Sequence, residues 1–536
     1  MIDEKDVLVS MRDGARLGAR IYRPDSGRSP ALLAIGPYRY DNNQLPPSPQ
    51  FLWRETGPIE WYVSQGYAFV HVDVRGTGIS DGEFGLLDRI EQQDMFDVVE
   101  WIARQPWCSG KVGGIGESYY CMAQWFMGAV NPPHLACIAP YDGMTDPYRY
   151  LAYQGGIEGY FPSFWYTISV RLPNLHPANR DHPREVTRDL MLDIQRHPFY
   201  DEFWRERAAV EQLDKIQVPA FIIGVWAKND FHLPGMLIGY ERVRGPRKLL
   251  ITATASPLTA LLDFASVEFH QKYLLPFYDR YLKDQQNGFE NRPNVEYAVH
   301  NTGVIRCFET WPPPGVKRRR LFLAKGPSGS VSSLNDGLLA PAPSPGGGST
   351  TYSYPQPTWL GVVVGPQPPD PVRQVLTFTT PTLDKDLELA GGAKLVLYAS
   401  STRDDMDFLV KVCEQFAQEP AAGMQPRFRV VGRGWLRASH QERDPRFDRE
   451  DAPYYTHARA VPLEPGKIYQ IEIAIVPCAY RFSKGNRIRL EIACTDSPVF
   501  DPLSMHMYRP DKIGADTIFH DAKYPSYLEL PVLDAE

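Results

Sequence analysis

Hydrophobic and polar residues alternate along the first 140 residues in a way that predicts strands separated by helices. Short apolar runs at 31–36 (ALLAIG) and 67–74 (YAFVHVDV) have the length and composition of buried strands. Apolar residues recur at helical spacing in DMFDVVEWIARQPW at 94–107, and further strand signals follow at 111–118 and 134–142. Strands separated by helices of this length favour a parallel sheet with helices on both faces.

The pattern changes twice after this point. From about 145 to 215 aromatic residues, prolines and helix-like runs replace the apolar strands, which predicts a helical cap. Strand signals then resume, and a helix at 266–284 is predicted to end the α/β part. Beyond about residue 315, short β-rich runs separated by turn residues are typical of a sandwich or jelly roll. We therefore predict an α/β domain in two parts (1–144 and 216–314), a helical cap (145–215) and a β jelly-roll domain (315–536).

Composition narrows the classes of function. The net charge is −7, which argues against a nucleic acid or an anionic membrane surface as partner. No run of 18 apolar residues predicts a membrane span, and the charged N-terminus lacks the features of a signal peptide, so we expect a cytoplasmic protein. The 7 cysteines are scattered, which disfavours disulfides and thiolate zinc sites. No metal-ligand cluster, phosphate loop or dinucleotide fingerprint predicts a cofactor. The composition is compatible with a homo-oligomer.

The sharpest chemical signal is the run Gly116-Glu117-Ser118-Tyr119-Tyr120, which stands between a predicted strand and a predicted helix. A nucleophilic serine on such a turn adopts a strained conformation, and small residues two before and two after it let strand and helix approach. Gly116 meets the first requirement, whereas Tyr120 stands where the second glycine is expected. The position favours Ser118 as a nucleophile over an ordinary turn serine.

Acyl transfer by a serine also needs an acid and a base. In this type of fold the chain order is serine, then Asp or Glu, then histidine. Asp230 follows the predicted strand at 218–227 and is a candidate acid, with a turn or helix-cap aspartate as the alternative. The histidine should follow the next strand, but Ser256 stands there, and the next histidine along the chain is His270.

Several longer runs resemble one known family in the same order. They are DVRGTGISDGEF (73–84), GIGESYY (114–120), DRYLKDQQNG (279–288), TWPPP (310–314) and, further on, GRGWLRASHQE, FSKGNRIRLEIACTDSPVFDP and DTIFHDAKYPSYLELPVL. Over nearly its whole length the chain thus resembles the cocaine esterase / X-prolyl dipeptidyl peptidase family. The resemblance implies an α/β-hydrolase fold with a helical cap, a C-terminal jelly roll, and hydrolysis of esters or amides.

The resemblance also implies roles for individual residues. Ser118 matches the nucleophile, and the Tyr119 backbone N–H and the Tyr38 hydroxyl match the two oxyanion donors. Asp230 matches the acid, in a loop that is longer than the family's. Ser256 occupies the position of the family's histidine, and the residues around it differ as well, which favours natural divergence over an engineered variant. A hydroxyl is not basic near neutral pH, and loss of a triad member costs roughly 10⁴- to 10⁶-fold in rate.

Three residues are candidates for a relocated base. His232 lies two residues after Asp230, and His270 lies on the predicted helix that follows the lost position. Glu117 is an ionisable neighbour of Ser118, whose pKa burial would raise. A structural role is the alternative for each, and for Glu117 it is the role of a packing or substrate-orienting carboxylate.

Three hypotheses of function follow. The first is a hydrolase or acyltransferase that uses Ser118 with a relocated base. The second is a lyase, cyclase or isomerase that reuses the oxyanion hole, and the third is a catalytically silent binding protein. A hydrophobic, carbonyl-bearing small molecule is the expected substrate, because the predicted cap is rich in aromatic residues. These residues are Tyr160, Phe161, Phe164, Trp165 and Tyr166.

Overall fold

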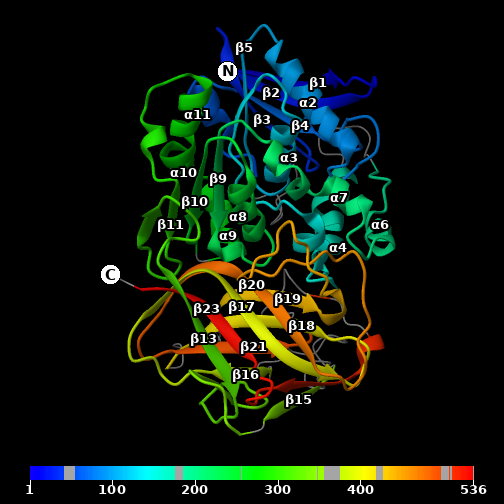
Figure 1. The fold of residues 1–536 in the computed structure, drawn as a ribbon. Helices are drawn as coiled ribbons and strands as arrows, with labels where there is room; N and C mark the ends of the chain where they lie inside the picture. Colours follow the sequence, from blue (N-terminus) through cyan, green and yellow to red (C-terminus); the bar gives the residue numbers. More distant parts are fainter. Residues whose placement is uncertain are drawn as a thin grey trace.

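The protein consists of an N-terminal α/β part and a C-terminal β part, which meet along a broad face (Figure 1). In Figure 1 the α/β part lies above the β part, and the cap lies at one side, next to the junction. The structure is a computed structural model, and it describes residues 1–41, 55–175, 185–254, 256–346, 348–354, 375–417, 427–496, 506 and 510–534.

The first sheet has ten strands in the order β1-β2-β4-β3-β5-β6-β9-β10-β11-β12. Its centre, from β4 through β11, is parallel, and β1, β2 and β12 pair antiparallel at the two edges. The carboxyl ends of the central strands lie at one edge, which is where such sheets carry their sites. The strands are β1 (Ile2–Ser10), β2 (Arg16–Arg23), β3 (Ser29–Gly36), β4 (Ala68–Asp73), β5 (Cys108–Gly114), β6 (Leu135–Ile138), β9 (Ala220–Val225), β10 (Arg247–Thr252), β11 (Val295–Ala298) and β12 (Ile305–Phe308).

Two of these strands differ from the sequence prediction. The helix expected at 266–284 does not end the α/β part, because β11 and β12 follow it and extend the sheet. Each of these strands has only four residues. Such short segments carry little periodicity, so their pairing partners, not their own pattern, define them as strands.

Helices cover the sheet on both faces, as the alternation of strands and helices predicts. All residues of α3 except its last are buried, because this helix is packed between the sheet and the elements around it. The helices are α1 (Ile59–Ser64), α2 (Arg89–Ala103), α3 (Tyr119–Val130), α8 (Leu233–Arg242), α9 (Pro257–Ala265), α10 (Val267–Phe269) and α11 (Leu275–Leu282), with η7 (Trp226–Lys228), η8 (His270–Leu274) and η9 (Phe289–Asn291) as 3₁₀- or π-helical turns.

The cap is mainly helical, with one small hairpin that the sequence did not predict, formed by β7 (Tyr153–Gln154) and β8 (Ile157–Glu158). Two of its segments, η3 and η4, are π-helical, a form that often occurs at functional sites. Apart from the hairpin, the cap elements are η3 (Tyr148–Ala152), α4 (Phe161–Trp165), η4 (Tyr166–Arg171), α5 (Leu172–Leu175), α6 (Leu190–Arg196), α7 (Glu202–Arg207), η5 (Ala209–Glu211) and η6 (Leu213–Lys215).

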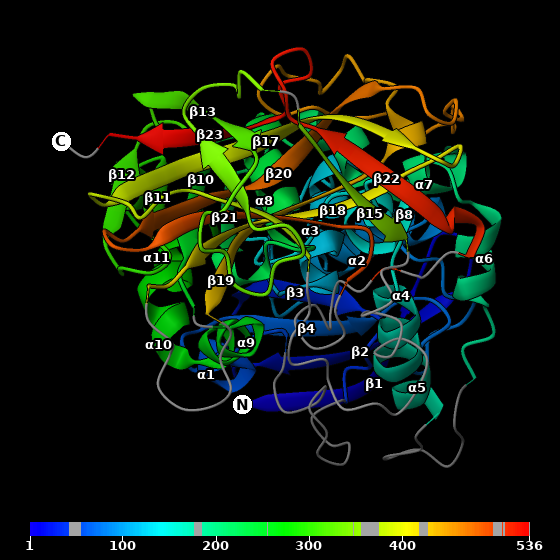
Figure 2. The same cartoon turned by 90° about the horizontal axis from the view of Figure 1, so that it is seen from below.

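The C-terminal part is an all-β domain, as predicted, and its long strands cross over one another beneath the α/β part (Figure 2). Its sheet follows the order β15-β22-β17-β23-β13-β14-β16-β21-β18-β19, with β20 paired to β17. The strands are β13 (Val316–Ala324), β14 (Gly337–Ala340), β15 (Ser349–Tyr354), β16 (Leu376–Thr379), β17 (Leu387–Ser401), β18 (Asp407–Gln415), β19 (Phe428–Arg437), β20 (Tyr469–Phe482), β21 (Arg487–Ala493), β22 (Gly514–Phe519) and β23 (Tyr527–Leu533), with short 3₁₀ turns η10 (Ala438–His440) and η11 (Pro510–Lys512).

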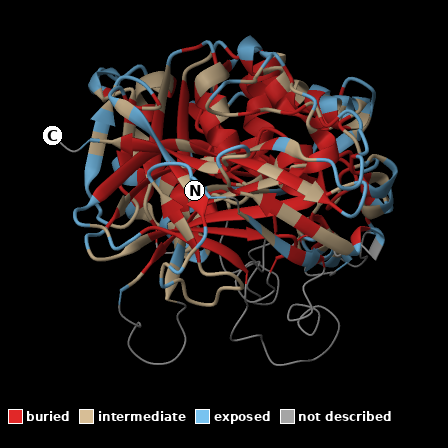
Figure 3. Ribbon diagram, turned by 60° about the horizontal axis from the view of Figure 1, so that its bottom comes forward, coloured by how far each residue is buried: buried red, intermediate tan, exposed pale blue. Residues whose placement is uncertain are grey.

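Buried residues run through both sheets and across the junction (Figure 3). The hydrophobic core of the α/β part continues into the β part through Ala390 and Ala479. Trp226, directly after β9, packs against Trp311 near the junction, with ring centroids 5.9 Å apart. In the same loop, the side chain of Asn229 donates to the carbonyl of Val431 on β19, at 3.2 Å, so the β domain supports the loop after β9. Within the described residues, no helix is long and apolar enough to cross a membrane.

Candidate active site

Ser118 occupies a strained turn between β5 and α3. Its backbone has φ 59° and ψ −116°, a conformation that side-chain-bearing residues rarely adopt. The Ser118 N–H donates to the carbonyl of Asp142, at 3.0 Å. Gly116 has φ +126°, and a Cβ there would lie 2.4 Å from the Cβ of Tyr120. The first small residue of the elbow is therefore required, and the serine is presented at the tip of the turn as a nucleophile elbow presents it.

Tyr120 fits the turn without distorting it, although a glycine was expected at its position. The side chain is buried, and its hydroxyl is 2.8 Å from Nε2 of His71 on β4. Its ring lies against Gly36 at the end of β3, where a Cβ would come within 2.7 Å of the ring. The space that the elbow needs is thus supplied by Gly36 on the neighbouring strand.

Ser118 opens into a narrow pocket of about 20 Å³, enough for a water molecule or two. Tyr38, Tyr119 and His232 contribute polar groups to the same pocket. The remaining lining is apolar and comes from the loops and the cap. Those residues are Leu86, Met122, Met144, Leu151, Phe161 and Trp165.

The Tyr38 hydroxyl lies beside Ser118. It interacts with the Ser118 side chain and accepts a hydrogen bond from Nε1 of Trp165, at 2.9 Å. Burial raises the pKa of this phenol, so it remains protonated and keeps a proton to donate. Tyr119 is the first residue of α3, and the first N–H groups of a helix have no partner within the helix. Both groups are thus suited to bind a developing oxyanion next to Ser118.

His232 is the ionisable side chain from the loop after β9 that faces this pocket. It is 4 % exposed, and its Nδ1 lies 3.5 Å from Oδ1 of Asp142. Burial lowers the pKa of His232, and the nearby Asp142 carboxylate opposes that shift. The imidazole is therefore neutral near neutral pH, which is the form a general base requires.

Asp142 lies at the end of the segment that follows β6. Its N–H donates to the carbonyl of Ile223 on β9, at 2.8 Å, and its own carbonyl accepts the Ser118 N–H. The residue thus ties the serine turn to the neighbouring strand. Burial opposes ionisation of its carboxyl, but Lys228 and His232 outweigh this effect and hold its pKa below the ordinary value. Asp142 is therefore a carboxylate.

A buried lysine, Lys228, forms an ion pair with the Asp142 carboxylate. The Lys228 ammonium is 3 % exposed and forms ion pairs with Asp142 and with Oε1 of Glu117, the latter at 2.5 Å. Burial raises the pKa of Glu117 and of nearby Glu55, the latter to about 8. The single ammonium is thus balanced mainly by Asp142. Glu117 acts as a buried partner of Lys228, the packing role that was one of its two interpretations.

The other predicted residues lie outside this pocket. Asp230 belongs to the same loop as His232, and its backbone carbonyl accepts a hydrogen bond from the side chain of Gln154 in the cap. The described lining of the pocket does not include Asp230, and the catalytic role of its carboxylate stays a prediction. His270 is fully buried, with its nitrogens 2.8 Å from the Tyr62 hydroxyl and 2.6 Å from the Phe264 carbonyl. Both nitrogens are engaged, so His270 is a core residue.

Ser256 begins a helix. Its hydroxyl accepts the N–H of Thr259 at 3.2 Å, and the Thr259 hydroxyl accepts the N–H of Ser256 at 2.8 Å. This reciprocal pair is a capping box at the start of α9. The described segment after β10 therefore performs a structural task; Ala255 lies outside the described residues.

The cap contributes fewer aromatic contacts than its sequence suggests. Phe161 and Trp165 line the pocket, and the Trp165 ring stacks on Tyr119. Tyr160 and Phe164 are exposed, and Tyr166 is buried against Phe84. In a helix only one face points into the pocket, so consecutive aromatic residues cannot all reach it.

Two residues of the site were missed by the sequence analysis. Asp142 is the last residue of the predicted strand at 134–142, so the argument used for Asp230 could have found it. Nothing local in the sequence marks Lys228 as buried, because its partners come from 86 or more positions earlier in the chain. No group of three or more potential metal-binding side chains occurs in the described part of the chain.

The sheet order together with a serine on the turn after β5 defines an α/β-hydrolase with a nucleophile elbow. Residues 13–255 match the family described as X-Pro dipeptidyl-peptidase (S15 family), and residues 287–529 match its C-terminal non-catalytic domain. The two matches span nearly the whole chain, so the protein belongs to this family and contains both of its domains.

Relatives and solved structures agree with this assignment. The chain is 24% identical to cocaine esterase from Rhodococcus sp., with 98% of both chains covered. It is 26% identical to a putative serine esterase from Mycobacterium bovis, covering 98% of this chain and 94% of the relative. A CocE/NonD family hydrolase from Staphylococcus aureus superimposes with a TM-score of 0.83 at 26% identity, covering 100% of this chain and 94% of the other.

Proposed function

We propose that the protein is a serine hydrolase that cleaves ester or amide bonds of small substrates through Ser118, with His232 as the general base and Asp142 as the acid that orients it. Tyr38 and the Tyr119 N–H are the proposed oxyanion donors. In this assignment the base and the acid lie after β9 and β6, and neither role falls to the segment after β10.

The observation that carries the proposal is that His232 opens into the Ser118 pocket while its other side faces Asp142. With Nδ1 directed at a carboxylate, the ring holds its proton there, and Nε2 is left to accept the proton of Ser118. The two atoms lie 3.5 Å apart, and within the described residues neither of them makes a hydrogen bond, so the bond has yet to form. Catalytic hydrogen bonds of this kind are often long before a substrate binds and shorten in the reacting complex.

The reaction follows from these groups. Ser118 Oγ attacks the carbonyl carbon while its proton passes to His232, and the carbonyl oxygen becomes an oxyanion between Tyr38 and the Tyr119 N–H. The imidazolium formed is stabilised by the Asp142 carboxylate and then protonates the leaving alcohol or amine. Water repeats the cycle on the acyl-enzyme, with His232 again as the base.

The substrate class rests on the relatives and on the lining of the pocket. Two of the relatives named above are called esterases, and the family is described as a dipeptidyl peptidase. The lining beside Ser118 is apolar and aromatic, which favours an apolar acyl group. Because the pocket is narrow, we expect short acyl chains to react faster than bulky ones.

The test is to measure the intact mass of the protein after incubation with a fluorophosphonate. The oxygen of an activated serine attacks the phosphorus of this reagent, fluoride leaves, and the phosphonyl group stays on the protein. We expect one adduct on the native protein, none on the Ser118→Ala variant, and strongly slowed labelling of His232→Ala. The Asp230→Asn variant should label at the native rate. Loss of labelling in Asp230→Asn with retention in His232→Ala would return the acid to Asp230 and exclude His232. No adduct on the native protein would contradict the hydrolase proposal and favour carbonyl chemistry without a nucleophile.

A further inference from the structure

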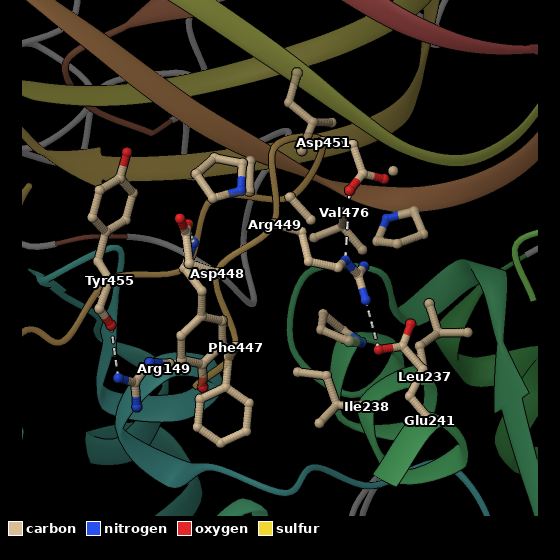
Figure 4. Close-up of a pocket in the computed structure, with 18 of the residues that line it drawn as sticks. Arg149, Leu237, Ile238, Glu241, Phe447, Asp448, Arg449, Asp451, Tyr455 and Val476 are labelled. Carbon is tan, nitrogen blue, oxygen red and sulfur yellow. Dashed lines mark hydrogen bonds and ion pairs between the residues drawn. The ribbon is translucent and has the colours of Figure 1, made fainter. Parts of the chain in front are cut away.

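A second cavity lies apart from the one at Ser118. It has a volume of about 360 Å³ and lies where α8, the cap and the β domain meet (Figure 4). None of the residues that line it also lines the Ser118 pocket. Its size falls within the usual range of small-molecule sites. It is therefore a separate candidate binding site.

One side of this interface cavity is apolar. Leu237 and Ile238 of α8 face it from the α/β part, and Phe447 and Val476 face it from the β domain (Figure 4). Apolar surface of this kind stabilises a bound hydrocarbon or aromatic group, because binding removes the apolar surface of both from water. The body of a ligand would lie against these side chains.

Most charged groups around the cavity already neutralise one another. The Glu241–Arg449 pair is visible in Figure 4, with its closest atoms 2.8 Å apart. Because these groups are satisfied within the protein, they do not call for a charged ligand. The other pairs are Asp448 with Arg443, Arg446 with Glu211 and Asp444, Arg149 with Asp146, and Asp451 with Arg318.

Arg242 is the exception among the described lining residues. It forms neither an ion pair nor a hydrogen bond there, and its guanidinium lies over the ring of Phe447, 4.7 Å from the ring centroid. Its Nε is buried and has no partner. The neighbouring acid, Glu241, is engaged with Arg449. A partly buried cation without a counter-ion favours an anionic partner.

Two further lining groups have unused hydrogen-bonding capacity. The hydroxyl of Tyr454 and Nε of Arg149 are buried without a partner, and Arg149 is only 7 % exposed. The Arg149 guanidinium lies 4.6 Å from the Tyr454 ring centroid, so these groups belong to one corner of the cavity. Two N–H donors and a phenol O–H match the acceptor oxygens of a carboxylate.

From these observations we infer that the interface cavity binds a small organic carboxylate with an apolar or aromatic body. Its carboxylate is held by Arg242, with Tyr454 as a second donor, and its body lies against Leu237 and Val476. This inference does not depend on the reaction at Ser118. A monoanion is the expected charge, because Arg242 is the one cation of the described lining that lacks a counter-ion.

The test is isothermal titration with 4-phenylbutyrate and with 4-phenyl-1-butanol, which differ in the carboxylate. We expect the carboxylate to bind about tenfold or more tightly than the alcohol, because a charged hydrogen bond to arginine discriminates by at least that factor. The Arg242→Gln variant should bind both compounds with the weak affinity of the alcohol. Tyr454→Phe should weaken the binding of 4-phenylbutyrate by a smaller factor than Arg242→Gln does.

Controls locate the binding and verify folding. Arg244→Gln removes an exposed arginine two positions along the chain and should leave both affinities unchanged. Tyr38→Phe should also leave both affinities unchanged. A loss of carboxylate affinity in the Tyr38→Phe variant would place the carboxylate beside Ser118 and overturn the inference. Equal binding of carboxylate and alcohol, or native affinity in a folded Arg242→Gln protein, would overturn it as well. Thermal unfolding of each variant verifies that it folds.

Discussion

The carboxyl ends of β6 and β9 and the carboxyl end of β10 are neighbours in one sheet, yet they carry different kinds of side chain. After β6 and β9 lie Asp142, Lys228 and His232, which are all buried, and Asp142 is paired with each of the other two. After β10 lies Ser256, whose hydrogen bonds cap the N-terminus of α9. The first region holds ionisable groups out of water, and the second holds a helix end in place.

The difference shows at which strand ends this chain buries ionisable side chains, an arrangement that is unfavourable for stability. Removing an ion from water costs several kcal/mol even when it is paired, so buried charges persist where they serve a purpose that packing alone cannot. Perturbed ionisable groups cluster at functional sites for this reason. A helix cap contributes only about 1 kcal/mol and can be placed at any helix. The strand ends after β6 and β9 are therefore where we expect substitutions to affect chemistry.

The largest effect should come from the histidine of the first region. We expect His232→Ala to lower kcat/KM for a p-nitrophenyl ester by about 10⁴-fold or more, because the variant lacks a base for Ser118. His134→Ala, which removes a partly exposed histidine paired with Glu100, should hydrolyse the ester at the native rate. A folded His232→Ala protein with more than a tenth of native activity would remove His232 from the mechanism.

A smaller loss is expected for the oxyanion donor. Tyr38→Phe deletes the hydroxyl beside Ser118 and should lower kcat by about 10²- to 10³-fold with little change in KM, because the hydrogen bond strengthens only as the oxyanion forms. Steady-state kinetics on the same ester separate the two parameters. A rise in KM at unchanged kcat would show that Tyr38 binds substrate and does not stabilise the oxyanion.

The third effect concerns the pH dependence of kcat/KM. Burial and, to a smaller extent, Lys228 lower the pKa of His232, against the opposing effect of Asp142. The base must be neutral, so the native enzyme should keep its kcat/KM below pH 6.5, with the acidic limb at the lowered pKa. Lys228→Met removes one of the lowering charges and should move that limb to higher pH.

Lys228→Met should also reduce stability by about 3–5 kcal/mol, because it leaves the buried Asp142 carboxylate without its cation. Urea unfolding measures this loss, and pH profiles of kcat/KM separate it from the effect on His232. A variant that loses stability while its acidic limb stays in place would limit Lys228 to a structural role.

The smallest effect should come from the second region. Ser256→Ala removes the cap of α9 and should cost about 1 kcal/mol in free energy of unfolding. Ester hydrolysis should stay within about twofold of the native rate, since the described pocket lining excludes Ser256. Ser256→Asp, which also caps helices, should restore the stability. A tenfold loss of activity in Ser256→Ala would place this segment in the chemistry.

Much of the architecture could be predicted from the sequence because its determinants are local. The apolar runs at β3, β4 and β9 and the turn at Ser118 identify an α/β sheet with a nucleophile elbow, and the short β-rich runs identify the second domain. Strands β11 and β12 were missed, because a four-residue strand is defined by the neighbour with which it pairs.

What the sequence by itself determined about the site is the turn that carries Ser118, the proposed nucleophile, since Gly116 stands two positions before Ser118 in the pattern of a nucleophile elbow. The tertiary structure alone decided the rest. His232 meets Asp142, which lies 90 positions away in the chain, because β6 and β9 are adjacent in the sheet. Lys228 is an ordinary charged residue in the sequence and a buried counter-ion in the fold. Burial and pairing set the ionisation of these groups, and both depend on which strand ends the fold brings together.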